Sequence, residues 1–157
     1  MKRNLFLFAV FMLVLAACGP GQLTVSDAWA RPALAGNNGA IYFVIQNPGA
    51  EDTLLRVATD AAGTVEMHMT MMVEGDAMEH DMSGSETGTL PEAQVMRMVQ
   101  QENVPVPGGE KVEFAPGGLH VMLIGLNADL VVGDTIEVTL TFEIAGEITL
   151  QVPVEEN

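Results

Sequence analysis

Residues 135–154 read TIEVTLTFEIAGEITLQVPV, and this stretch sets the fold class. Thr135–Glu143 alternates apolar and polar side chains, and Glu147–Val154 does the same. Ala145-Gly146 lies between them and is typical of a tight hairpin turn. A period of two places one set of side chains in a core and the other in solvent, as in a strand. The stretch therefore predicts an antiparallel β-hairpin.

The same pattern continues upstream as short runs separated by turn residues, and we find no convincing helix. Val104–Glu110 contains two prolines, which remove ladder donors and exclude a central strand. About nine strands at intervals of roughly ten residues favour an all-β, Greek-key β-sandwich or barrel. The seven predicted strands before the hairpin are Leu23–Arg31, Ala40–Gln46, Thr53–Thr59, Thr64–Thr70, Gln94–Gln100, Lys111–Phe114 and Leu119–Leu126.

The composition limits the class of partner. The chain has 157 residues, with 6 Lys+Arg against 21 Asp+Glu and a formal charge of −15. A nucleic-acid binder needs a basic face, so this class is excluded, whereas cationic ligands are favoured. The chain is 48% hydrophobic but only 5% aromatic, so its core should be mostly aliphatic.

The first residues are typical of a bacterial lipoprotein signal. Lys2 and Arg3 precede an apolar run too short to span a bilayer comfortably, and Leu15-Ala16-Ala17-Cys18 resembles a lipobox. We expect residues 1–17 to be removed, Cys18 to be lipidated and 18–22 to be a linker to a domain over 23–157. The protein would then be extracytoplasmic, in the periplasm or at the cell surface, and anchored to a membrane by lipid. An ordinary secretory signal with a chance Cys is the alternative.

Methionine and histidine are concentrated in one interval. The chain has 11 Met and 3 His, and all except Met1 and Met12 lie within 67–122. Core packing would spread Met over all strands, because Met is a general gap-filler. Thioether with imidazole is a soft donor set that suits Cu(I), whereas hard cations prefer oxygen ligands. The clustering therefore indicates a copper site.

Spacing indicates which side chains could share one ion. His120 and Met122 lie two residues apart in a strand pattern, so they point to the same face, roughly 6–7 Å apart. Met96 and Met98 have the same relation on another strand. His120 could instead be a satisfied core histidine, but its neighbour Met122 favours a ligand.

The strand predicted over Thr64–Thr70 has two different faces. His68 shares the polar face with Glu66, where it could be a ligand or a solvated surface histidine. Met67 and Met69 lie on the opposite face, which favours a place in the core.

These residues resemble the periplasmic copper chaperone family PCuAC, whose signature is His, ten residues, Met, twenty-one residues and then His-x-Met. Residues 99–119 separate Met98 from His120, which matches the second spacing, and Met122 follows. The likeness covers roughly Val25–Val154. The flanking segments that agree are Ala28-Trp29-Ala30-Arg31-Pro32, Asn38-Gly39-Ala40-Ile41-Tyr42-Phe43, Pro116-Gly117-Gly118-Leu119 and Gly133-Asp134.

The resemblance implies a cupredoxin-like β-sandwich that binds one Cu(I) near its surface through His68, Met98, His120 and Met122. It further implies delivery of copper to the CuA centre of cytochrome c oxidase. The partners would then be oxidase subunit II and a Sco-type thiol protein.

One spacing departs from the family pattern. Between His68 and Met98 lie 29 residues instead of ten, an insertion of 19. The Met/His-rich insertion, at about 69–91, is predicted to be a loop. The motif Met78-x-His80-x-Met82 in this insertion could be a second copper site, which could also bind Cu(II), or could pass copper to the first site. It could instead belong to a solvated acidic loop without a metal. His80 could also replace His68 as a ligand.

Two functions fit these residues: a Cu(I) metallochaperone, or a copper-buffering or resistance lipoprotein whose loop is a sink. A blue-copper redox protein would need a Cys thiolate, and the only Cys is Cys18. An adhesive or scaffolding β-sandwich would leave the Met/His clustering unexplained. No Ser-His-Asp pattern, phosphate loop or CxxC motif occurs, so we do not expect an enzyme.

Overall fold

The computed structural model describes residues 21–74 and 94–156, and within these ranges the chain forms ten strands and no helix. The predicted all-β fold is confirmed. None of the described residues belongs to a helix long and apolar enough to cross a membrane. The strands are β1 (Thr24–Ala30), β2 (Gly39–Asn47), β3 (Asp52–Ala58), β4 (Ala62–Glu74), β5 (Gln94–Gln101), β6 (Val104–Val106), β7 (Glu110–Phe114), β8 (Leu119–Leu126), β9 (Thr135–Phe142) and β10 (Glu147–Pro153).

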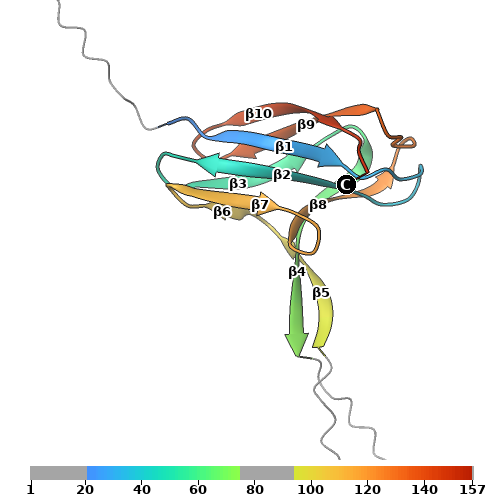
Figure 1. Cartoon of the computed structure of the whole chain (residues 1–157), viewed down its shortest axis with the longest axis horizontal. Coiled ribbons are helices and arrows are strands. Elements are labelled where there is room, and N and C mark those ends of the chain that lie inside the picture. Colours follow the sequence, from blue (N-terminus) through green and yellow to red (C-terminus); the bar gives the residue numbers. More distant parts are fainter. Residues whose placement is uncertain (1–20, 75–93, 157) are drawn as a thin grey trace, which may run out of the picture.

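The strands form two sheets that pack face to face. The larger sheet has the order β1-β2-β7-β8-β4-β5, with an additional pairing of β2 with β8, and the smaller has the order β10-β9-β3-β6. Nine pairings are given by the described strands, and only β7–β8 is parallel. Figure 1 shows the layered body and the β4–β5 hairpin, which projects away from it. The predicted hairpin of β9 and β10 is confirmed.

The core lies between the sheets and is built mainly from aliphatic side chains. In β9 every second residue from Val138 to Phe142 is buried, as the alternation predicts, whereas β8 buries His120 and Val121 in succession. Phe43 and Phe114 stack at 4.3 Å between ring centroids and hold β2 against β7. The largest fully buried side chains are Phe43, Phe114, Ile41, Ile45, Leu54, Leu123, Leu140, Val106, Val121, Val138, Val152 and Val154.

The proline-containing segment forms a short edge strand, β6. It is one strand more than the nine that the sequence predicted. It pairs only with β3, where Pro105 lies opposite Thr53. Pro has no N–H to donate, so an edge is the position in a sheet that tolerates it. The expectation that this segment is not a central strand is confirmed.

Strand β4 is longer than the sequence predicted. It continues past Thr70 to Glu74, because its last residues pair in register with β5. Residues 71–74, which we expected to belong to a loop, are therefore strand. The rest of the predicted loop, 75–91, lies outside the described residues.

Candidate metal centre

Two histidines face each other across neighbouring strands of the larger sheet. His68 on β4 lies directly opposite His120 on β8, with 5.8 Å between ring centroids and 61° between ring planes. Met67 and Val121, their neighbours in sequence, are buried in the core. Because side chains alternate along a strand, both imidazoles lie on the outer face of this sheet.

Hydrogen bonding fixes the tautomer of His120. Its Nδ1 lies 3.0 Å from the carbonyl oxygen of Gly118. A carbonyl oxygen only accepts, so Nδ1 carries the proton and Nε2 keeps its lone pair. The turn before β8 makes this possible, because Gly117 has φ 82°, a left-handed conformation that favours glycine. His120 is only 8% exposed, so the bond to Gly118 orients a ring already held by packing.

The other histidine has the opposite arrangement. Nε2 of His68 lies 2.8 Å from a carboxylate oxygen of Glu66 on the same strand, and that oxygen accepts a hydrogen bond from Nε2–H. Nδ1 of His68 is buried and has no hydrogen-bond partner in the described chain. A buried acceptor without a partner costs about 1–3 kcal/mol. A metal ion bound to Nδ1 would remove that cost, and a carboxylate behind a ligating histidine is a common second partner.

Two methionines share the same sheet face. Met122 on β8 lies opposite Glu66 on β4. Met98 on β5 lies opposite Thr70 on β4. Alternation places both on the side of His68 and His120. Met122 is half-buried, whereas Met98 is 59% exposed. The outer face therefore combines two imidazoles, each with one nitrogen that makes no hydrogen bond within the described chain, and two thioethers, a donor set that fits Cu(I).

The centre borders a small hollow on the same face. Its volume is about 210 Å³, and His120 and Met122 form part of its wall. Arg31 and Tyr42 also line this hollow, with the Arg31 guanidinium 5.8 Å from the centroid of the Tyr42 ring. Trp29 contacts the same ring at 4.5 Å between centroids. The centre is thus accessible from solvent without lying free on the surface.

Comparison with known families decides which family the chain represents. Residues 23–88 and 81–154 match the model of the family described as "Putative lipoprotein LpqE-like". The chain belongs to this PCuAC-type family. The resemblance inferred from the sequence is therefore confirmed.

Two curated relatives extend this result. The chain is 31% identical over 134 residues to "Putative lipoprotein Lxx21020" of Leifsonia xyli subsp. xyli, covering 84% of this chain and 69% of that protein. It is 27% identical over 121 residues to "Uncharacterized protein RP573" of Rickettsia prowazekii, covering 73% of this chain. It spans 56% of the length of the Rickettsia protein.

Solved PCuAC domains share the fold. The copper-bound PCuAC domain from PmoF2 has a TM-score of 0.63 and 24% identity, covering 88% of this chain and 97% of that one. The apo PCuAC domain from PmoF1 has a TM-score of 0.59 and 28% identity, covering 87% and 96%. CuI-DR1885 from Deinococcus radiodurans has a TM-score of 0.55 and 23% identity, covering 85% and 79%. The predicted cupredoxin-like architecture is confirmed.

Other residues predicted from the sequence are not part of this candidate centre. The candidate second-site residues Met78, His80 and Met82, and the lipidation candidate Cys18, fall outside the described residues. The expectation of a place in the core is confirmed for Met67, which is 5% exposed, whereas Met69 is only partly buried.

Sequence reasoning missed the partners of the two histidines. Glu66 carried a signal, since it shares the face of His68 two residues away. The carbonyl of Gly118 could not be identified from the sequence, because every residue has a backbone carbonyl and the residue type does not show which one accepts a hydrogen bond. Met72 on β4 was also missed, because the predicted strand ended at Thr70.

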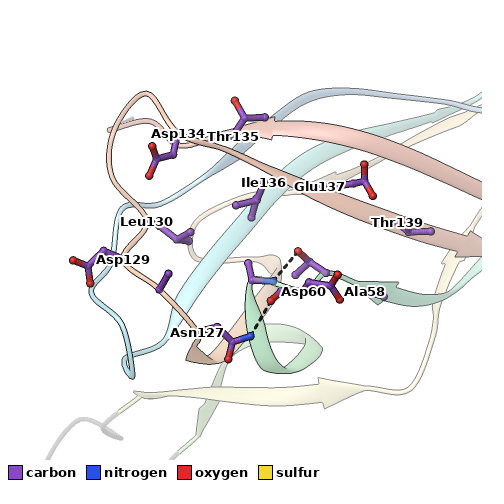
Figure 2. Close-up of a pocket in the computed structure, with 13 residues that line it drawn as sticks. Ala58, Asp60, Asn127, Asp129, Leu130, Asp134, Thr135, Ile136, Glu137 and Thr139 are labelled. Carbon is purple, nitrogen blue, oxygen red and sulfur yellow. Dashed lines mark hydrogen bonds between the residues drawn. The ribbon is translucent and has the colours of Figure 1, made fainter.

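A larger hollow at one end of the sandwich has a different chemistry. Its volume is about 500 Å³. Figure 2 shows its lining residues, which come from the β3–β4 turn, the segment after β8 and the start of β9. No His, Met or Cys lines it. Two of its carboxylates accept backbone N–H groups: Asp129 from Ala35 at 2.7 Å and Asp134 from Val131 at 3.1 Å. These acids stabilise loops of the PCuAC domain.

Proposed function

We propose that this protein is an extracytoplasmic Cu(I) carrier that binds one ion through His68, Met98, His120 and Met122 and transfers it to another protein. On this proposal the protein is a binding protein and not an enzyme. Copper is its cargo and not a resident cofactor.

One observation carries the proposal: the paired histidines each present a single free nitrogen at the same face. Nδ1 of His120 is engaged by Gly118, and Nε2 of His68 is engaged by Glu66. The unpartnered Nδ1 of His68 is difficult to explain in a purely structural histidine. Thioethers bind Cu(I) without releasing a proton, so only the two imidazoles of the proposed donor set can lose the ion to competing protons.

The exposure of the centre supports transfer rather than permanent storage. Met98 is 59% exposed, so a partner can approach the ion from its side. Transfer then proceeds by exchange of ligands, in which donors of the acceptor replace thioethers while copper stays Cu(I). The copper does not change its oxidation state in this step, so no oxidant or reductant is needed.

The family suggests where the carrier operates. The family and the Leifsonia relative are both named as lipoproteins, which supports anchoring through Cys18 outside the cytoplasm. Two structural neighbours are copper-bound forms, the PCuAC domain from PmoF2 and CuI-DR1885. The PCuAC resemblance makes the CuA centre in subunit II of cytochrome c oxidase the proposed acceptor, with a Sco-type protein as a further partner.

Binding followed by transfer tests the proposal. The full chain, purified in mild detergent, is loaded anaerobically with one equivalent of Cu(I) and mixed with apo subunit II. Copper should appear on subunit II after separation, and Met122→Leu should abolish or strongly reduce loading. Met71→Leu, which removes a thioether from the other face of β4, is the matched control and should load normally. Equal loading of both variants would contradict the assignment.

Copper buffering is a second function, favoured by the exposed methionines of β4 and β5. A buffer binds several ions and keeps them when an acceptor is present. If loaded protein retains its copper against apo subunit II but releases it to a small chelator, buffering replaces transfer as the function.

A further inference from the structure

The β4–β5 hairpin carries methionines that the four-ligand centre does not use. Met72 on β4 lies directly opposite Met96 on β5, and Met98 lies opposite Thr70 one step nearer the body. All three share the even-numbered face with His68, which lies opposite Gln100. The three thioethers therefore follow one face of the hairpin and lead towards the histidine pair.

These side chains are not part of a core. Met72, Met96 and Met98 are 65%, 64% and 59% exposed. Four of the nine exposed large apolar side chains among the described residues are methionines of β4 and β5, and three of those four lie on this single face. Such a concentration of flexible apolar side chains in water requires an explanation beyond packing.

Their spacing allows them to share one ion. Directly opposite residues have Cβ atoms about 4.5–5.5 Å apart, and diagonal neighbours lie about 7–8 Å apart, within reach of long side chains. Met72 and Met96 are directly opposite, and Met98 is diagonal to Met72. Three thioethers without a charged ligand select a soft monovalent cation and reject hard divalent ones.

The charge distribution is compatible with a cation. The chain has a formal charge of −15, and Arg97, the cation of β5, belongs to the alternate set of side chains on the opposite face. A singly charged cation bound to neutral thioethers on this face therefore has no positively charged side chain of β5 beside it to repel it.

We propose that Met72, Met96 and Met98 form a second, weaker Cu(I) site that takes up copper at the hairpin and passes it to the histidine centre. Met98 belongs to both sites, so it can stay bound while Met72 and Met96 are exchanged for His68 and His120. When both sites are filled, Met98 serves the histidine centre and Met72 and Met96 alone hold the second ion, which makes that ion the weaker one. Copper remains Cu(I) throughout, and only metal–ligand bonds break and form. The relay rests on the proposed function, whereas the three-sulfur site does not.

The double variant Met72→Leu with Met96→Leu tests the site, since Leu keeps the volume and apolar character of Met. The full chain is titrated with Cu(I) against a competing chelator under anaerobic conditions, and its copper content and loading rate are measured. Wild type and Met71→Leu should bind a second, weaker Cu(I). The double variant should lose only that ion and should load the remaining site more slowly.

Three results would overturn this inference. The first is a second copper that survives in the double variant, as expected if the exposed methionines serve protein contact through their apolar surface. The second is loss of that copper in a Met78→Leu, His80→Ala, Met82→Leu variant but not in the double variant. The third is a wild-type chain that binds only one copper. Failure of the proposed function would look different: no copper would have nitrogen ligands, whatever stands at 72 and 96.

Discussion

Asp52 and His68 are both polar side chains withdrawn from solvent, but only one of them is fully partnered. The Asp52 carboxylate accepts the backbone N–H groups of Thr53 at 2.7 Å, Ile144 at 2.9 Å and Ala145 at 2.9 Å. It thereby ties β3 to the β9–β10 turn. His68 is bound by Glu66 on one side and leaves Nδ1 buried without a partner in the described chain.

The difference separates a structural polar group from a functional one. Folding alone favours the complete set of partners seen at Asp52, because a buried unpartnered group costs free energy. A ligand must instead keep a lone pair free until the ion arrives. Mutations at the two places should therefore have separable effects, on stability at Asp52 and on copper at the histidine pair.

The largest expected effect is on copper affinity in His120→Ala. This change removes one of the four proposed donors. Loss of an outer partner alone lowers metal affinity about 10–100-fold, so loss of the donor should exceed that range. Competition with a Cu(I) chelator measures the affinity. His120→Asn, of similar polarity, controls for the buried site, and unchanged affinity in both variants would remove His120 from the centre.

Glu66→Ala should lower Cu(I) affinity about 10–100-fold by releasing the ring of His68 from its partner. Glu66→Gln keeps an oxygen that can accept a hydrogen bond from Nε2–H of His68, so this variant should retain part of the copper affinity that Glu66→Ala loses. Glu102→Gln, at an exposed position, serves as the control. If Glu66→Ala binds copper like wild type, the carboxylate has no positioning role.

Asp52→Asn should reduce the free energy of unfolding by about 1–3 kcal/mol, since it weakens the acceptor of several backbone N–H groups. Copper affinity should stay unchanged, which sharpens the contrast with His68. Urea unfolding and chelator competition on the same sample measure the two quantities. A loss of copper without a loss of stability would break the comparison.

The pH dependence of stability should reveal Asp52 as well. Burial alone would raise its pKa, but the N–H groups of Ile144, Thr53 and Ala145 outweigh burial and lower the pKa below the ordinary value of 3.8. A lowered pKa gives stability that is complete above 3.8 and is lost as pH falls towards the folded-state pKa. Acid unfolding curves should therefore show a smaller loss of stability below that pH in Asp52→Asn than in wild type.

The smallest effect is expected for Met71→Leu. Met71 is 41% exposed and faces away from the proposed donors, so stability should change by no more than about 0.5 kcal/mol. Copper stoichiometry should also stay the same. A marked loss of copper in this variant would mean that methionines on both faces of β4 bind copper.

The sequence predicted the strands well because the alternation of apolar and polar residues is local information. It also excluded 104–110 from a central position, since proline acts through its own missing N–H. The end of β4 could not be predicted, because Met72 continues the strand only by pairing with Met96, across an interval of 23 residues.

The candidate centre was predicted as residue types but not as an arrangement. The pattern that pairs His120 with Met122 on one face is local, whereas the register that sets His68 opposite His120 depends on tertiary pairing of β4 with β8. The tautomers depend on a backbone carbonyl and a neighbouring carboxylate, and only the folded chain brings these to the rings.

X-ray absorption on the full chain loaded with one equivalent of Cu(I) tests the central claim most directly, because it identifies the donor atoms. The account predicts a mixed shell of nitrogen and sulfur, with the nitrogen contribution reduced in His68→Ala and in His120→Ala. A shell of sulfur alone in wild type, unchanged in both variants, would contradict the assignment of the histidine pair as the primary copper site.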